Sequence, residues 1–170
     1  QGTGFSSLNG SYKICVELSD TAGNTVYGSS TTFSVKTAVP SFSSLSLSAV
    51  ASDGYVSISE NGLTSSLVGT LTGASYDTAA YSLAAQGVTC DGALTYGSAP
   101  QANDAGITSN GSYYKVCVKL TDNAGNPAAY GGTSSFQALI SSPSCSGVSL
   151  TGDVSDGYLN STERSHTSSL

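Results

Sequence analysis

Apolar and polar residues alternate along residues 114–120 of the chain. The even positions hold Tyr, Val or Leu, and the odd positions between them hold Lys or Cys. This period of two predicts a half-buried antiparallel β-strand. The strand is followed at residues 122–126 by Asp-Asn-Ala-Gly-Asn, a composition that favours a turn, because Asp and Asn bond their own backbone and Gly accepts a positive φ.

The same strand and turn occur earlier, at residues 12–24, displaced by 102 residues (114 − 12 = 102). Pro40 returns as Pro143, displaced by 103 (143 − 40 = 103). An internal repeat of this length indicates tandem structural units. We therefore expect residues 1–37 to be the last strands of one repeat, residues 41–140 a complete repeat, and residues 143–170 the first strands of the next. On this pattern the chain is expected to be a piece of a longer array.

Within residues 41–140 the alternation predicts a series of short strands separated by turn signals. They are expected at residues 45–49, 63–71, 79–90, 93–96, 114–120 and 130–138. Residues 52–60 are expected to form a loop in which Tyr55 and Ile58 close the end of the core, and residues 97–112 a long connection. In the first unit, residues 27–35 should pair with residues 12–19. About seven short strands in about 100 residues predict an all-β, immunoglobulin-like sandwich, repeated in tandem.

The composition narrows the class of protein. Hydrophobic residues make up 38% of the chain, enough for a packed core, while charged residues make up only 9% and Trp and Met are absent. The net charge of −6 disfavours nucleic-acid binding, since phosphates require a basic surface, but is compatible with cations. The sequence holds neither a membrane-spanning apolar stretch nor a signal peptide.

Four cysteines, at positions 15, 90, 117 and 145, allow three pairings. Within the complete repeat Cys90–Cys117 is the natural pair. Its closure of 27 residues (117 − 90 = 27) corresponds to about 3–4 kcal/mol of stabilisation in a chain-entropy model. Cys15 and Cys145 would pair with each other, outside the chain, or not at all. Disulfides favour an extracellular or periplasmic location.

The order of the motifs resembles that of bacterial Ig-like repeats in large surface adhesins and biofilm-associated proteins. The motifs are a Ser-Tyr-Lys-Val type of strand, Thr-Asp-x-Ala-Gly-Asn, Thr-Phe-x-Val, a Pro-containing linker, and Asp-Gly-Tyr-Leu-Asn-x-x-Glu at residues 156–163. The resemblance covers nearly the whole chain. It implies a rod of sandwiches that holds a binding tip away from a cell, with calcium ions stiffening the junctions in many members.

Two features depart from that family. Its linker often carries an Asp that residues 35–40, Val-Lys-Thr-Ala-Val-Pro, and residues 139–143 lack. Cysteines are also unusual in it. Tyr114 precedes Cys117 by three residues rather than by the two seen in antibody domains, so Cys117 has the opposite parity. We therefore expect Cys117 on the outer face, in a surface disulfide that joins strands or tethers a loop.

Calcium binds six to eight oxygen ligands, and turn acids at the ends of stacked repeats would supply them. The turn at residues 122–126 is expected to approach the loop of the preceding unit that corresponds to residues 53–60. The alternative is that these residues only cap turns or face solvent. The candidate ligands are Asp20, Asp53, Glu60, Asp122, Asn126, Asp156 and Glu163.

Other chemistry has less support in the sequence. Asn9, Asn110 and Asn160 begin Asn-x-Ser/Thr sequons, although two of them are Asn-Gly pairs that are equally explained as turns. His166 is the one histidine, and the acids recur at repeated turn positions, which favours a structural role over catalysis.

The sequence thus predicts a non-catalytic spacer repeat of a bacterial adhesin, stalk or surface filament. Its expected partners are neighbouring Ig-like repeats and other copies of the chain. Two alternatives remain open at this point. One is a module that binds a glycan or protein through its loops. The other is a polymerising appendage subunit whose incomplete end repeats are completed by neighbouring chains through strand exchange.

Overall fold

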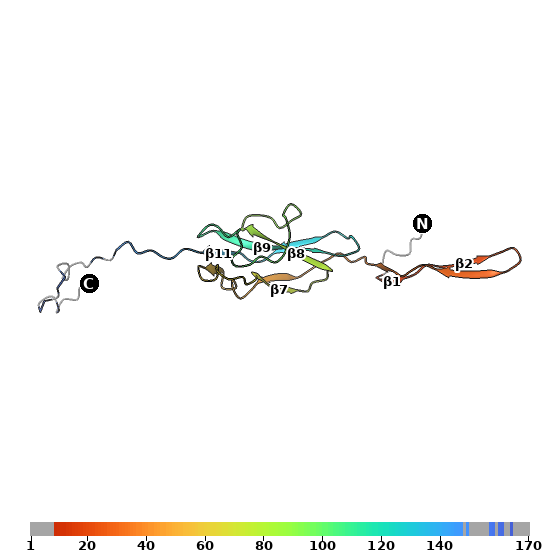
Figure 1. Ribbon diagram of the computed structural model, residues 1–170, viewed down its shortest axis with the longest axis horizontal. Coiled ribbons are helices and arrows are strands. Elements are labelled where there is room, and N and C mark those ends of the chain that lie inside the picture. Colours follow the sequence, from red (N-terminus) through yellow and green to blue (C-terminus); the bar gives the residue numbers. More distant parts are fainter. Residues whose placement is uncertain (1–8, 148, 150–156, 159, 162–163, 165–170) are drawn as a thin grey trace.

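In the computed structural model the chain forms a central β-sandwich with a long β-hairpin projecting from one end (Figure 1). The structure describes residues 9–147, 149, 157–158, 160–161 and 164. The elements of this described part are all strands, as the alternation predicts. None of the described residues belongs to a helix that could span a membrane.

The hairpin is built from four short strands in antiparallel pairs. Strand β1 (Gly10–Tyr12) pairs with β4 (Phe33–Val35), and β2 (Cys15–Ser19) pairs with β3 (Thr25–Ser29). The sequence predicts one continuous strand on each side, and this is wrong: both sides are interrupted in the middle. Across the interruption the Ser30 hydroxyl accepts the Ile14 N–H at 2.9 Å, and the Ser30 N–H donates to the Ile14 carbonyl at 2.8 Å. A side chain thus replaces one backbone acceptor of the ladder.

The larger sheet of the sandwich is centred on β9 (Tyr113–Thr121). On one side β8 (Thr78–Ala85) pairs with it antiparallel along its whole length, from Thr78–Thr121 to Ala85–Tyr114. On the other side both β10 (Ala129–Gly132) and β11 (Phe136–Leu139) pair with it antiparallel. Strand β6 (Tyr55–Ser57) extends this sheet by pairing parallel with β11.

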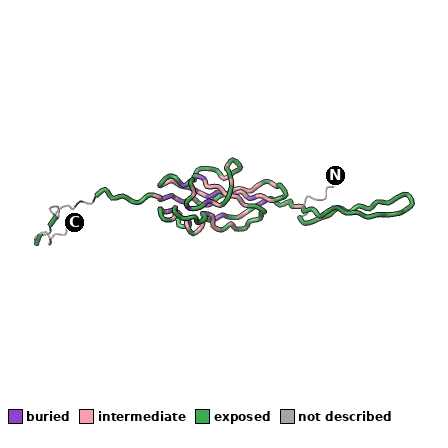
Figure 2. The backbone as a smooth tube through the Cα atoms, viewed as in Figure 1, coloured by how far each residue is buried: buried purple, intermediate pink, exposed green. Residues whose placement is uncertain are grey.

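The opposite layer contains β5 (Ser44–Leu47) and β7 (Val68–Thr72), which are antiparallel to each other. Residues 100–103 add an irregular third segment. The Leu67 N–H donates to the Pro100 carbonyl at 2.8 Å, and the Ala102 N–H to the Ser65 carbonyl at 2.9 Å. Apolar side chains pack between the two layers, so the sandwich has its own core. The buried residues lie in the sandwich, whereas the hairpin is almost entirely exposed (Figure 2). Its largest fully buried side chains are Phe136, Leu67, Leu120, Val56, Val116, Val118 and Cys117.

Three local predictions are corrected. Residues 52–60 are not only a loop, since they contain β6, and Val56 rather than Tyr55 or Ile58 is buried there. Residues 93–96 form no strand: a turn at residues 92–93 opens this segment, and Gly97 after it forms an isolated β-bridge with Tyr81. Strand β8 ends at Ala85, because a turn at residues 86–88 follows it and carries the chain out of the sheet.

Candidate functional site: the junction of hairpin and sandwich

The turn after β9 is organised by the carboxylate of Asp122. Its Oδ1 accepts the N–H groups of Ala124 and Asn126, both at 3.1 Å, and its Oδ2 accepts the Asn126 side-chain amide at 2.7 Å. Gly125 has a φ of +79°, which favours glycine at that position. The hydrogen bond from the Asn126 side chain, helped by the backbone N–H groups, lowers the pKa of Asp122 below its ordinary value.

The tip of the hairpin repeats this turn. Asp20 Oδ1 accepts the N–H groups of Ala22 and Asn24 at 2.9 Å, and Asp20 Oδ2 accepts the Asn24 side-chain amide at 2.7 Å. Gly23 has a φ of +88°. The Asn24 side chain likewise lowers the pKa of Asp20. The two copies of the sequence therefore form the same hydrogen-bonded turn.

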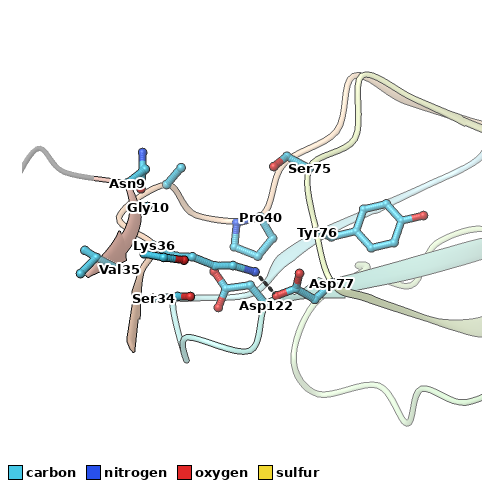
Figure 3. Close-up of a pocket in the computed structure, with 12 residues that line it drawn as sticks. Asn9, Gly10, Ser34, Val35, Lys36, Pro40, Ser75, Tyr76, Asp77 and Asp122 are labelled. Atoms are coloured by element: carbon cyan, nitrogen blue, oxygen red, sulfur yellow. Dashed lines mark hydrogen bonds and ion pairs between the residues drawn. The ribbon is translucent and has the colours of Figure 1, made fainter. Parts of the chain in front are cut away.

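The turn of the sandwich also holds the linker that arrives from the hairpin. The Asn126 amide donates to the carbonyl of Lys36 at 3.1 Å and to that of Ala38 at 3.4 Å. Asn126 thus joins its own turn to the backbone of residues 36–38. An open depression of about 390 Å³ lies at this junction, lined in part by Asn9, Val35, Pro40 and Tyr76 (Figure 3).

An ion pair crosses the same junction. Lys36 Nζ lies 2.5 Å from Asp77 Oδ2, and that oxygen also accepts the Asn123 N–H at 2.8 Å (Figure 3). The hydrogen bond from Lys36 is the main reason that the pKa of Asp77 lies below its ordinary value. The Lys36 and Asp77 side chains remain 43% and 26% exposed, so solvent screens the attraction. No pattern in the sequence predicts this pair, since its members are 41 residues apart.

In both copies of the repeat an asparagine holds the segment that follows the final strand, which is β11 in the sandwich and β4 in the hairpin. Asn110 Oδ1 accepts the Ser141 N–H at 3.1 Å, and Asn9 Oδ1 accepts the Thr37 N–H at 2.8 Å. These two sequon asparagines therefore have a structural role in the repeat. Asn160 is exposed. Glycosylation of the three asparagines stays a prediction.

The remaining candidate calcium ligands lie apart from the junction. Asp53 Oδ1 accepts the Tyr55 N–H at 3.0 Å, and Glu60 Oε2 accepts the Ser57 N–H at 2.8 Å and the Ser57 hydroxyl at 2.7 Å. Asp156 and Glu163 lie outside the described residues. Within the described part, no three acidic, His or Cys side chains gather as a metal site.

The donor set at the junction does not fit a calcium ion well. Both carboxylate oxygens of Asp122 already accept N–H groups, and the nearby Asp77 already faces the ammonium of Lys36. A cation bound there would be repelled by that ammonium and would compete with the turn for its oxygens. In the described junction Asp122 caps its own turn, and Asp77 pairs with Lys36.

The predicted Cys90–Cys117 disulfide is confirmed, with a Cα–Cα distance of 5.4 Å. Cys90 lies in the loop after β8, so the bond tethers that loop to the central strand. Gly132 is the cross-strand neighbour of Cys117, and a Cβ there would lie 2.8 Å from Cys90 Sγ. A glycine at position 132 thus leaves room for the disulfide. Cys15 and Cys145 are free and exposed.

The expectation that Cys117 lies at the surface is wrong. Its side chain points away from the core as the parity predicts, yet it is fully buried. The loop that begins after β8 covers this outer face, with the ring of Tyr96 5.9 Å from that of Tyr130 and the Tyr96 hydroxyl bonded to the Asp91 carbonyl at 3.0 Å. Burial raises the pKa of Tyr96, and the charge of Asp91 adds to this effect.

One further detail of the repeat was missed by the sequence reasoning. Thr133 interrupts the strand pair of the sandwich as Ser30 interrupts the hairpin: its hydroxyl accepts the Val116 N–H at 3.1 Å, and its N–H donates to the Val116 carbonyl at 2.9 Å. The signal lies in the sequence, because a hydroxyl residue follows the repeated Tyr-Gly pair two positions later at both sites.

We compared the chain with models of protein families, with curated proteins and with solved structures, and none of them matches it.

Proposed function

We propose that this chain is a non-catalytic spacer of an extracellular bacterial surface protein, such as an adhesin, stalk or filament, and that its sandwich is an Ig-like unit of a tandem array. One observation carries the proposal. The linker of residues 36–40 reaches the sandwich at the turn after β9, whereas residues 140–147 leave from the opposite end (Figure 1). Units connected in this way lie end to end and add length rather than bulk.

The arrangement of the strands supports the Ig-like part of the proposal. Two layers pack on a common core, and the chain passes from β5 in one layer to β6 in the other. Strand β9 lies between β8 and the strands β10 and β11 in one layer, while β5 and β7 form the other. This division between two mostly antiparallel layers supports an Ig-like sandwich.

The hydrogen bonds of the linker support the spacer role. Asn126 and the Lys36–Asp77 pair hold the linker at the entrance of the sandwich, and Asn110 holds the segment at its exit. Contacts at both ends restrict bending between neighbouring units, which a spacer needs in order to keep a binding tip at a distance. The disulfide ties the central strand to the loop that covers it.

Small-angle X-ray scattering on arrays of one, two and three repeats tests this proposal. The first repeat is residues 36–143 and each added repeat is residues 41–143, so that Pro143 takes the place of Pro40 at every junction and the linker is retained. A spacer predicts that the maximum dimension grows by the same step with each added repeat. Compact particles, whose maximum dimension grows much more slowly than the number of repeats, would contradict the proposal.

A glycan array distinguishes the spacer from a binding module. The chain is applied as a labelled protein, with a denatured sample of the same chain as the control. The spacer proposal predicts signals no higher than those of the control. Saturable binding of one glycan class that is lost on denaturation would show that this chain itself carries the recognition function.

A further inference from the structure

The apolar face of the hairpin is exposed, although the same face is buried in the sandwich. Ile14, Val16 and Leu18 are 64%, 47% and 60% exposed. Their counterparts 102 residues later, Val116, Val118 and Leu120, are all fully buried. In the sandwich this face is covered by residues that precede β9 in the chain, among them Leu45 and Leu67. The repeat therefore indicates what kind of chain fits the hairpin.

A glycine in the hairpin, Gly28, indicates one feature of the chain segment that would cover the exposed face. Gly28 corresponds to Gly131 in β10, and neither has a positive φ that would require glycine. At Gly131 the reason is clear, because a Cβ would lie 2.3 Å from Cζ of the Phe42 ring. At Gly28 the nearest atom to such a Cβ is Val16 Cγ1 at 3.4 Å, so the space above the strand is open. A glycine within a strand is unfavourable by itself and marks a place where another group approaches closely.

The tip of the hairpin specifies a second feature. Asn24 makes the same bond to Asp20 that Asn126 makes to Asp122, at 2.7 Å in both. The Asn126 amide donates further, to two linker carbonyls that are two residues apart. For the Asn24 amide, the described part of the chain provides Asp20 as an acceptor and no linker carbonyl.

In the sandwich, one extended segment of the chain supplies both the carbonyls at the turn and the aromatic ring over the glycine. In the sandwich, residues 36–38 contact Asn126 at the turn, Phe42 lies over Gly131, and Leu45 joins Val118 and Leu120 in the core. We propose that the apolar face of the hairpin binds an extended polypeptide segment that resembles residues 36–45. Two carbonyls of this segment would accept hydrogen bonds at the tip, an aromatic ring would lie over Gly28, and alternating Leu residues would pack along Val16 and Leu18. This partner is the part of another repeat that corresponds to residues 36–109. The inference therefore rests on the proposed function, a tandem array of such repeats.

A lengthened chain tests the inference. Residues 36–109 are repeated ahead of Asn9, so that Ser109 of the added copy is followed by the Asn-Gly pair of the hairpin. The added copy contributes one further cysteine, the equivalent of Cys90. The original chain has two free thiols, Cys15 and Cys145. If the added segment covers the hairpin, Cys15 pairs with the added cysteine and titration of the lengthened chain finds one free thiol.

Three free thiols in the lengthened chain, with hydrogen exchange at Val16 and Leu18 as fast as in the original chain, would overturn the inference. Small-angle X-ray scattering on the arrays tests the spacer role independently of this partner. Steady growth of the array with three free thiols would refute this partner and leave the spacer role intact. One free thiol with compact arrays would refute the spacer role and leave the partner intact.

Gly28→Val tests the aromatic position. In the original chain the substitution should leave the melting temperature unchanged or raise it, because the space is open and Val favours strands. In the lengthened chain it should lower the melting temperature of the new unit, as Gly131→Val should lower that of the existing sandwich. Phe42→Ala in the added copy should then restore the loss. Equal melting temperatures for the lengthened chain with Gly28 and with Val at that position, while Gly131→Val is harmful, would contradict an aromatic ring over Gly28.

Discussion

The side-chain amide of Asn126 donates a hydrogen bond to the backbone carbonyl of Lys36, 90 residues earlier in the chain, at 3.1 Å. This bond attaches the turn of the sandwich to the linker that precedes it. Asn24, the counterpart of Asn126 at the tip of the hairpin, forms the same turn and contacts no linker in the described part of the chain. Comparing substitutions of Asn126 and Asn24 therefore separates the effect of the turn from the effect of the linker contact.

Asn126→Ala should free the linker. The ¹⁵N relaxation order parameters of residues 37–39 should fall from the range of rigid backbone, about 0.85, to below about 0.6. Asn24→Ala, which disturbs an equivalent turn without a linker contact, is the matched control and should leave those order parameters unchanged. Equal order parameters in the two variants would mean that the ion pair or the core alone fixes the linker.

Acid should weaken the junction through Asp77. Its pKa in the folded protein is lowered, chiefly by the hydrogen bond from Lys36, so its charged form contributes stability above the ordinary pKa of about 3.9 and loses it as the pH falls through that value toward the folded pKa. The melting temperatures of the original chain and of Asp77→Asn should thus differ at pH 7, and the difference should shrink as the pH falls below the ordinary pKa toward the folded pKa. A difference as large at pH 3 as at pH 7 would show that Asp77 acts by some means other than its charge.

Removal of calcium should leave the melting temperature unchanged. The carboxylate oxygens of Asp122 and Asp20 already accept N–H groups of their own turns, and Lys36 already faces Asp77. The measurement compares chelator with added calcium at matched ionic strength, because surface charges respond to any salt. A clear rise in melting temperature with calcium, absent in Asp122→Asn, would restore the junction as a calcium site.

Thr133→Val should destabilise the sandwich by about 1–3 kcal/mol, because the Val116 N–H would lose its acceptor in a buried place. Urea denaturation measures the change. Thr133→Ser keeps the hydroxyl and is the control for shape, with an expected loss well below that of the Val variant. If Val and Ser cost the same, the hydroxyl bond has no special role and only the methyl contact counts.

The sequence was sufficient for the features that depend on local order. The alternation at residues 114–120 predicted the central strand, the repeated Asp-x-Ala-Gly-Asn predicted both turns, and the count of cysteines in one repeat predicted the Cys90–Cys117 pair. Each of these depends on neighbouring residues or on a repeat that is visible in the sequence itself.

The features that depend on distant segments could not be predicted in the same way. Cys117 has the parity of an outward side chain, and its burial comes from a loop without periodicity. Residues 55–57 follow a turn signal, and they become a strand because β11 offers them a parallel edge. The Lys36–Asp77 pair requires the linker to pass beside the start of β8, which no pattern in the sequence records.

Single-molecule stretching of an array of these repeats tests whether the chain is a spacer that resists mechanical force. A spacer of this kind should unfold in separate events, one for each sandwich. Reduction of the disulfide should lengthen each event by about 95 Å, which is the Cys90–Cys117 separation of 27 residues at about 3.5 Å per residue. Smooth extension without separate events, or steps that reduction leaves unchanged, would contradict the spacer role.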